Sequence, residues 1–159
     1  MNQSQQVKLS DYQALAEFRY QIRRFVHFSE EAARHAQVEP QHHQLMLAVK
    51  GKLDGEPARI SYLAERLQIQ HHSAVELVDR LFKKGLISRT RSEQDRREVY
   101  VQLTERGEHV LDALTVHTRA ELRSAAPALV ATLRHLTNRE KAGRSPRRRP
   151  RTAATRRSR

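Results

Sequence analysis

The stretch DRREVYVQLTERG, residues 95–107, constrains the fold of this chain more than any other. It begins as a cluster of charged side chains and continues as an alternating run in which Val99, Val101 and Leu103 share one face. The run LISRTR precedes it, and the polar segment SEQD joins the two, so together they predict a β-hairpin. Because Thr104 can cap a helix, we expect the hairpin to lead directly into a long helix.

Two short helices are expected before this hairpin. A brief extended piece, ARIS, precedes YLAERL, for which Ser61 can act as the cap. A second helix is expected from Ser73 to Lys84, ending at Gly85, with one apolar face and a polar face opposite. Two short helices followed by a hairpin form a winged helix-turn-helix, in which the second helix enters the major groove of DNA.

Longer helices are expected on both sides of this unit. The N-terminal helix, residues 11–36, carries an apolar seam at alternating steps of three and four residues. The seam consists of Leu15, Phe18, Ile22, Phe25, Ser29, Ala32 and Ala36. A shorter helix follows from Pro40, and a C-terminal helix spans residues 104–138 with a kink or break at Pro127. The expected fold class is therefore mainly α with a small β-hairpin wing.

The positive charge of the chain is concentrated at one end. The formal net charge is +12, and residues 139–159 contribute most of it. This arginine-rich segment has too few apolar side chains to fold alone, so we expect it to be disordered, like the polar residues 1–9. No apolar run is long enough for a membrane span and no signal pattern is present, so a cytoplasmic location is the default expectation. The absence of cysteine excludes disulfide scaffolds and thiol redox sensing.

Residues 58–107 resemble the DNA-binding lobe of the MarR family of bacterial transcription regulators. The motifs that carry the resemblance are D-x-R at residues 95–97, LT at residues 103–104 followed by Gly107, and ELVDRLFKKGLI, which is similar to the end of the family's recognition helix. The resemblance implies a MarR-like domain over residues 10–138, with a winged lobe at 58–103 and dimerisation helices at both ends. It also implies a homodimer in which each protomer binds half of a palindromic site on double-stranded DNA.

The resemblance places the base-facing stretch at the start of the second short helix. This stretch comprises Gln70, His71, His72, Ser73 and Glu76, and Arg80 lies at the margin of the same polar face. The family often has a basic residue where this chain has Glu76. A carboxylate in the groove either accepts a hydrogen bond from a cytosine amine, and so specifies a base, or weakens binding by repulsion.

Four arginines bracket the expected hairpin turn: Arg89, Arg91, Arg96 and Arg97. A projecting cationic loop suits phosphates or the narrow minor groove. Asp95 lies among them and can hold an arginine in one rotamer, which lowers the entropic cost of a contact. The resemblance makes Asp95 and Arg97 the wing pair, with Arg97 reaching DNA or bracing the lobe. The alternative is a solvated hairpin with ordinary surface charge.

Relatives in this family often respond to a small aromatic or anionic ligand between the two lobes. By position, the first two helices would line such a pocket, and the candidates are His27, Phe28, His43 and Met46. Core packing explains the apolar candidates equally well. Among the nine histidines, His42–His43 and His71–His72 are adjacent pairs. Neighbours on a helix point about 100° apart, so neither pair chelates a metal by itself, and no metal or cofactor is expected.

The motifs of common enzyme classes are missing from the sequence. It contains no glycine-rich phosphate loop, no HExxH and no nucleophile elbow, so we expect no catalytic residues. The leading interpretation is a dimeric, ligand-responsive repressor that binds a pseudo-palindromic operator. The alternative is a non-specific nucleic-acid-binding or architectural protein driven by the arginine-rich C-terminal segment, which would show a steep salt dependence and little sequence preference.

Overall fold

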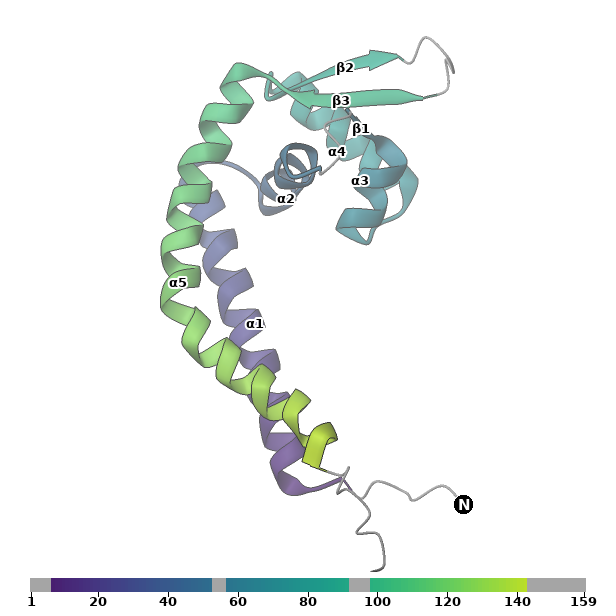
Figure 1. Ribbon diagram of the computed structural model, residues 1–159. Coiled ribbons are helices and arrows are strands. Elements are labelled where there is room, and N and C mark those ends of the chain that lie inside the picture. The colour runs from purple at the N-terminus through teal and green to yellow at the C-terminus, as the bar shows by residue number, and fades with distance from the viewer. Residues whose placement is uncertain (1–6, 53–56, 92–97, 143–159) are drawn as a thin grey trace, which may run out of the picture.

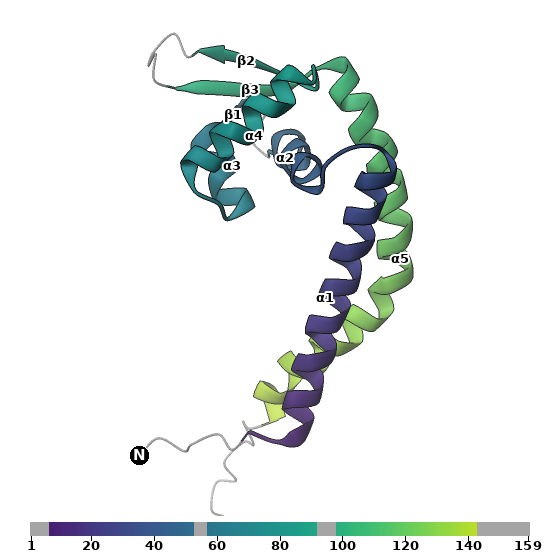
Figure 2. The ribbon, with the colours of Figure 1, turned by 180° about the vertical axis from the view of Figure 1, so that it is seen from behind.

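Two lobes make up the protein, a compact winged lobe and a long arm of two antiparallel helices (Figures 1 and 2). The computed structural model describes residues 7–52, 57–91 and 98–142, with side chains as far as residue 137. The elements in chain order are α1 (Leu9–His35), α2 (Pro40–Lys50), β1 (Ala58–Arg59), α3 (Ile60–Leu67), α4 (His71–Lys83), β2 (Ile87–Arg91), β3 (Val99–Leu103) and α5 (Glu105–Ala142). α1 and α5 form the arm, and the other elements gather beside the C-terminal end of α1. This order confirms the expected mainly helical fold with a hairpin wing.

The strands form one antiparallel sheet in the order β1-β3-β2. In the expected hairpin, Ile87 pairs with Leu103 and Arg89 pairs with Val101. The short extended piece before α3 adds a third strand, since Ala58 also pairs with Val101, from the other side. Val101 is therefore at the centre of the sheet, and it is fully buried as the alternating pattern predicts.

The core of the winged lobe forms between α2, α3, α4 and the sheet. The apolar face expected on the second short helix is confirmed, because Ala74, Leu77, Val78 and Leu81 are all buried. They pack with Leu45, Met46, Leu63, Leu86, Ile87 and Val101. α4 is thus held from one side, and its opposite side faces outward.

Both short helices begin earlier than expected. α3 begins at Ile60 and α4 at His71, so Ser61 and Ser73 lie inside their helices and are not the caps. Arg59, at the end of β1, occupies the N-cap position of α3. The early start of α4 follows from the turn before it: Gln68 adopts the left-handed conformation (φ 54°), and Ile69 N donates to the carbonyl of Ala64 at 3.0 Å. This closing pattern ends α3 without glycine and lets α4 start immediately after Gln70. Gly85 (φ 68°) ends α4 in the same way, as expected.

The two helices of the arm match the expected pattern in part. Leu15 and Ile22 of the expected seam are 49% and 41% exposed, whereas their neighbours Ala14 and Gln21 are buried. Phe18, Phe25, Ser29 and Ala32 of the same seam are half-buried, so α1 covers part of the seam within the chain and leaves Leu15 and Ile22 exposed. α5 continues through Pro127 as one bent helix and is not split there (Figure 1). It extends to Ala142, so its last four residues belong to the segment for which disorder was expected.

Candidate nucleic-acid interface

The outward face of α4 carries most of the residues expected to face bases. His71, His72 and Glu76 are exposed and Ser73 is half-buried. Gln70 occupies the N-cap position of α4 without a capping hydrogen bond from its side chain. Arg80 lies one turn after Glu76, and its guanidinium is 3.5 Å from the Glu76 carboxylate. At this distance, and with both side chains exposed, the pair contributes little to stability. The carboxylate therefore remains available to another partner.

The hairpin lies against the end of α4, and the two arginines of β2 differ in their contacts. Arg89 and Arg91 are two residues apart on β2 and so project from the same face of the strand. Arg89 forms an ion pair with Asp79 of α4, and its guanidinium carbon lies 4.1 Å from the centre of the Phe82 ring. Among the described residues, no ion pair or hydrogen bond engages the side chain of Arg91, which is exposed. Asp95, Arg96 and Arg97 lie outside the described residues.

The start of α5 is joined to the end of α4 through the LT and glycine motif. Thr104 N donates to the Leu86 carbonyl at 3.1 Å, and the Thr104 hydroxyl donates to the Gly85 carbonyl at 2.8 Å. The same hydroxyl accepts from Gly107 N at 3.1 Å, which confirms Thr104 as the cap of α5. A Cβ at position 107 would lie 2.0 Å from the Leu86 carbonyl oxygen, so only glycine permits this approach. The motif is therefore a rigid joint between the arm and the recognition helix.

Charged pairs connect the other helices near the same end of the arm. Glu39 at the start of α2 accepts from Lys84 after α4 at 3.2 Å, and this hydrogen bond is the main cause that lowers the pKa of the Glu39 carboxyl. Lys50 at the end of α2 pairs with Glu108 in the first turn of α5, which raises the pKa of Lys50. The end of α4, α2 and α5 are thus linked to one another by polar contacts.

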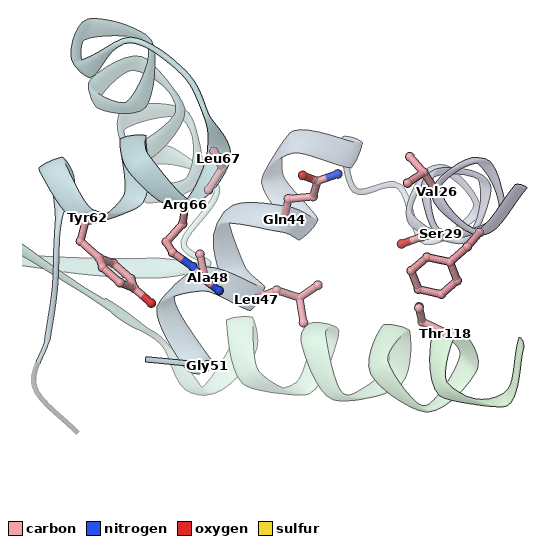
Figure 3. A pocket seen from close by; sticks show the side chains of 11 residues that line it. Val26, Ser29, Gln44, Leu47, Ala48, Gly51, Tyr62, Arg66, Leu67 and Thr118 are labelled. Atoms are coloured by element: carbon pink, nitrogen blue, oxygen red, sulfur yellow. The ribbon is translucent and has the colours of Figure 1, made fainter. Parts of the chain in front are cut away.

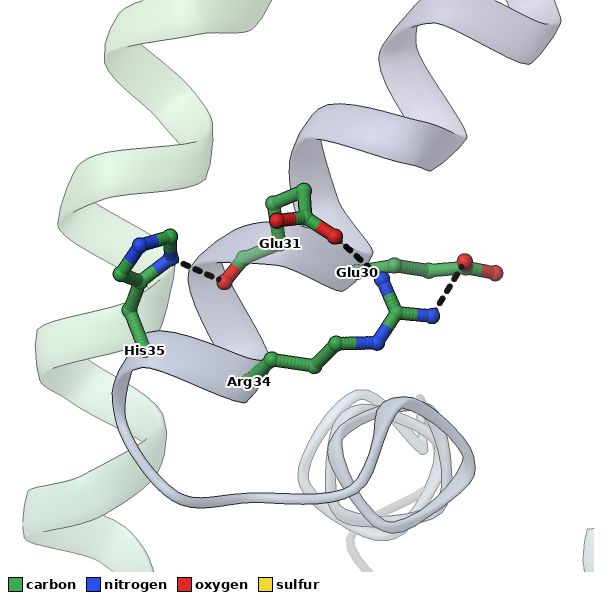
Figure 4. A network of polar contacts seen from close by, with 4 residues as sticks. All are labelled: Glu30, Glu31, Arg34 and His35. Atoms are coloured by element: carbon green, nitrogen blue, oxygen red, sulfur yellow. Dashed lines mark hydrogen bonds and ion pairs between the residues drawn. The ribbon is translucent and has the colours of Figure 1, made fainter.

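The last turn of α1 has its own network (Figure 4). Arg34 donates to Glu31 at 2.6 Å and to Glu30 at 3.1 Å, and the bond to Glu31 is the main cause that raises the pKa of Arg34. The imidazole Nδ1 of His35 lies 2.7 Å from the Glu31 carbonyl oxygen, so it donates there. These contacts stabilise the end of α1 immediately before the chain enters the winged lobe.

His42 and His43 are buried in α2, at 0% and 1% exposure. Burial is the main cause that lowers the pKa of both imidazoles. Glu39, 3.7 Å from His42, raises the pKa of His42, whereas Lys84 and Arg80 lower it further. Both side chains are therefore neutral members of the core at pH 7. His43, a candidate for ligand binding from the sequence, lies in this core together with the fully buried Met46.

A cavity of about 320 Å³ lies between the two lobes (Figure 3). Its lining residues are Phe25, Val26 and Ser29 of α1, Gln44, Leu47, Ala48 and Gly51 at α2, Tyr62, Arg66 and Leu67 of α3, and Thr118 of α5. Arg66 is the one charged residue of this lining, and it extends with Tyr62 from α3 toward α2. The cavity thus combines apolar walls with one cation and several hydroxyl and amide groups.

None of the four residues proposed from the sequence lines this cavity. His27 is exposed on α1, and Phe28 stacks on His117 of α5 with ring centres 5.4 Å apart. That stack borders a different hollow between α1 and α5. Arg66 was missed because it belongs to a helix assigned only to the DNA-binding lobe. The sequence could have indicated it, because Arg66 follows Tyr62 by four residues and this spacing places both side chains on one face of the helix.

In residues 7–52, 57–91 and 98–142, no group of three or more His, Cys, Asp or Glu side chains is arranged to hold a metal ion. None of the helices in the same ranges combines the length and the apolar composition that crossing a bilayer requires.

α4 follows a tight turn, buries its apolar face in the lobe and exposes its polar face beside an arginine-bearing hairpin. This arrangement defines a winged helix-turn-helix DNA-binding protein. Residues 54–99 match the model of the MarR family. The winged lobe is therefore similar in sequence to the MarR family, and the fold of most of the chain is that of solved MarR family structures.

Known proteins are similar over the winged lobe in sequence and over most of the chain in fold. The uncharacterized HTH-type transcriptional regulator YfiV of Bacillus subtilis is 39% identical over 56 residues, which cover 35% of this chain and 35% of YfiV. The HTH-type transcriptional regulator SarZ of Staphylococcus epidermidis is 37% identical over 62 residues, 39% of this chain and 42% of SarZ. The chain thus spans less than half the length of either curated relative. AbsC of Streptomyces coelicolor, a MarR family transcriptional regulator, is 18% identical with a TM-score of 0.68, covering 88% of this chain and 97% of AbsC.

Proposed function

We propose that the protein is a sequence-specific transcription regulator that binds a pseudo-palindromic operator as a homodimer and represses transcription until a small molecule releases it. The observation that carries the proposal is the orientation of α4. Its apolar face is buried in the winged lobe, while His71, His72 and Glu76 are exposed beside the arginine-bearing hairpin. A helix held in this way can enter the major groove and present side chains to base edges.

The residues of the interface divide into two groups by chemistry. Gln70, His71, His72, Ser73 and Glu76 would face bases, and Arg80 and Arg91 would contact the phosphate backbone. Glu76 would accept from a cytosine amine, because its only described partner, Arg80, is 3.5 Å away and exposed. Asp95, Arg96 and Arg97 are proposed as wing contacts on the basis of the sequence motif alone.

Exposed apolar side chains along the arm support the homodimer. Leu15 and Ile22 of α1 and Leu122, Val130 and Leu133 of α5 are each at least 40% exposed. Several exposed large apolar side chains on two helices that pack together are typical of an interface between chains. A second copy of the chain, joined through α1 and α5, would cover them and would place two copies of α4 on one face for the two halves of a palindrome.

The cavity between the lobes is the proposed effector site. Its volume of about 320 Å³ is at the lower end of the range for ligand pockets, which favours a single-ring acid. The guanidinium of Arg66 would pair with the carboxylate, and Phe25, Val26 and Leu47 would contact the ring. BpsR of Bordetella bronchiseptica has a similar fold, with 16% identity and a TM-score of 0.59. The DNA binding of BpsR is described as regulated by 6-hydroxynicotinic acid. Such a ligand would release DNA only if it bound the released arrangement of the lobes more tightly.

Selection from random duplex DNA at about 150 mM salt tests the proposal, since weak backbone binding is suppressed there. The full chain is compared with a variant in which every arginine of residues 143–159 is replaced by glutamine. Enrichment of the same palindrome by both chains supports the regulator. A second candidate, a non-specific nucleic-acid-binding or architectural protein, is favoured by the net charge of +12. It is supported if the unmodified chain binds any duplex, neither chain enriches a sequence and the variant loses binding.

A further inference from the structure

Arg89 occupies an unusual place for an arginine on a DNA-binding hairpin. It lies on β2 on the same face as Ile87, which is buried in the core, so its side chain continues that face toward α4. There it crosses one helical turn, pairing with Asp79 and stacking on the Phe82 ring three residues further along. The side chain of Arg89 is 33% exposed and that of Asp79 is 43% exposed, so both are partly removed from solvent.

The arrangement uses properties that arginine alone among the basic residues provides. A guanidinium is planar, so it can lie over an aromatic ring and still direct N–H groups to a carboxylate at its edge. A lysine ammonium could keep the charge but not this geometry. The contact is therefore specific to the shape of the side chain as well as to its charge.

The ion pair with Asp79 also determines whether the positive charge of Arg89 is available to DNA. The Asp79 carboxylate lies on the recognition helix, where it would repel phosphates if it were unpaired. The ion pair neutralises the Asp79 carboxylate, so the positive charge of Arg89 is balanced within the lobe and is not free to pair with a phosphate. Arg91, two residues along the same strand and exposed, has no such partner among the described residues.

We propose that Arg89, Asp79 and Phe82 form a brace that fixes the angle between the recognition helix and the wing, and that Arg89 is a positioning residue and not a phosphate contact. This inference rests on the proposed DNA-binding function. The brace holds α4 and the hairpin in one relative orientation before DNA is bound. Binding therefore avoids the entropic cost of ordering the two elements against each other.

Two charge-conserving variants, Arg89→Lys and Arg91→Lys, separate a brace from a backbone contact. Lysine remains an effective phosphate ligand, so an arginine that contacts phosphate tolerates the change. We expect Arg89→Lys to weaken binding to the selected operator about threefold to tenfold, and Arg91→Lys to change it less than about twofold. Affinity is measured by fluorescence anisotropy with the full chain, and thermal unfolding checks that each variant is folded.

The salt dependence of binding gives a second readout that loss of stability alone would not move. The slope of log affinity against log salt falls by about 0.9 for each phosphate contact that is removed. We expect Arg91→Met to lower the slope by about this amount and Arg89→Met to leave it unchanged while weakening binding. Equal effects of the two lysine variants, or equal losses of slope in the two methionine variants, would overturn the brace. If the unmodified chain shows no sequence preference, the proposed function fails, and the brace is then tested by amide exchange across Val99–Leu103, which must accelerate in Arg89→Met.

Discussion

Thr104 and Gly107 form the joint between the arm and the winged lobe. The Thr104 hydroxyl accepts from Gly107 N at 3.1 Å and donates to the carbonyl of Gly85 at 2.8 Å. One side chain therefore caps α5 and holds the turn that ends the recognition helix. A change in the arm that moves the start of α5 must also move the end of α4, because Gly107 lies directly against the Leu86 carbonyl.

We expect Thr104→Ala to lower the free energy of unfolding by about 1–2 kcal/mol, because it removes an N-cap and leaves the Gly85 carbonyl without its donor. Thr104→Ser, which keeps the hydroxyl, should lose less than half of that. Urea denaturation followed by circular dichroism measures both. Thr132→Ala is the matched control, since that hydroxyl bonds only to the Ala128 carbonyl of its own helix. An effect at position 132 as large as that at position 104 would contradict the joint.

The buried histidines make the protein less stable in mild acid. Burial lowers the pKa of His42 and His43 below the ordinary value of 6.5. As the pH falls through 6.5, the unfolded chain takes up protons that the folded chain does not, so stability is full above this pH and declines below it. The decline is at most about 1.4 kcal/mol per pH unit for each histidine, because each takes up at most one proton.

Urea denaturation at intervals between pH 5 and 8 measures this decline. We expect His42→Gln and His43→Gln each to reduce its slope between pH 5 and 6.5. A loss of packing in the variants lowers the free energy of unfolding equally at every pH. It is measured at pH 8, where the histidines are neutral in both the folded and the unfolded chain. A slope that both variants leave unchanged would exclude the buried histidines as its source.

Ile22→Glu should disrupt the proposed homodimer. The side chain lies on the exposed apolar surface of the arm, and a carboxylate there would be buried without a partner on association. We expect the dissociation constant of the dimer to rise at least about a hundredfold, measured by analytical ultracentrifugation across a concentration series. Leu47→Glu is matched in exposure, because both residues are 41% exposed, but it lies on α2 of the winged lobe. It should leave the dimer intact; equal dissociation in both variants would point to general unfolding.

Glu76→Ala should change the operator preference at one position of each half-site. Loss of a carboxylate that accepts from a cytosine amine removes about 1–3 kcal/mol of discrimination against other bases there. If Glu76 only repels phosphates, the variant instead binds all sequences more tightly by the same factor. Repeating the duplex selection with Glu76→Ala distinguishes the two outcomes. Glu65→Ala, an exposed carboxylate on α3, serves as the control.

Arg66→Gln should weaken the binding of an aromatic acid at least about tenfold, because a charge-assisted hydrogen bond is replaced by a neutral one. Titration calorimetry with benzoic acid and with 6-hydroxynicotinic acid measures the affinity. The adjacent variant Glu65→Gln changes an exposed side chain that does not line the cavity. Equal affinity of the unmodified chain and Arg66→Gln for both acids would remove Arg66 from the site.

Local features of the sequence were sufficient for the hairpin and for two of the helix ends. The alternation of Val99, Val101 and Leu103 predicted both the strand and its buried face, because side chains alternate along any strand. Thr104 and Gly85 were correctly assigned as cap and helix end, since each acts on residues close to it in the chain. Ser61 and Ser73 were assigned wrongly as caps. Arg59 at the end of β1 occupies the cap position of α3, and Gln70 occupies that of α4, because Gln68 turns the chain in the left-handed conformation that sequence rules reserve mainly for glycine.

The sequence by itself determined the order of elements, the winged helix-turn-helix and the polar face of α4, all of which follow from periodicities of two and 3.6 residues. Only the tertiary structure decided which face of α1 packs on α5, how far α5 continues, and which residues line the cavity between the lobes. It also decided the partners of Arg89, whose contacts on α4 lie ten and seven residues earlier in the chain and leave no periodic signal. Contacts between elements depend on how the elements pack, and packing selects among faces that the sequence pattern leaves nearly equivalent.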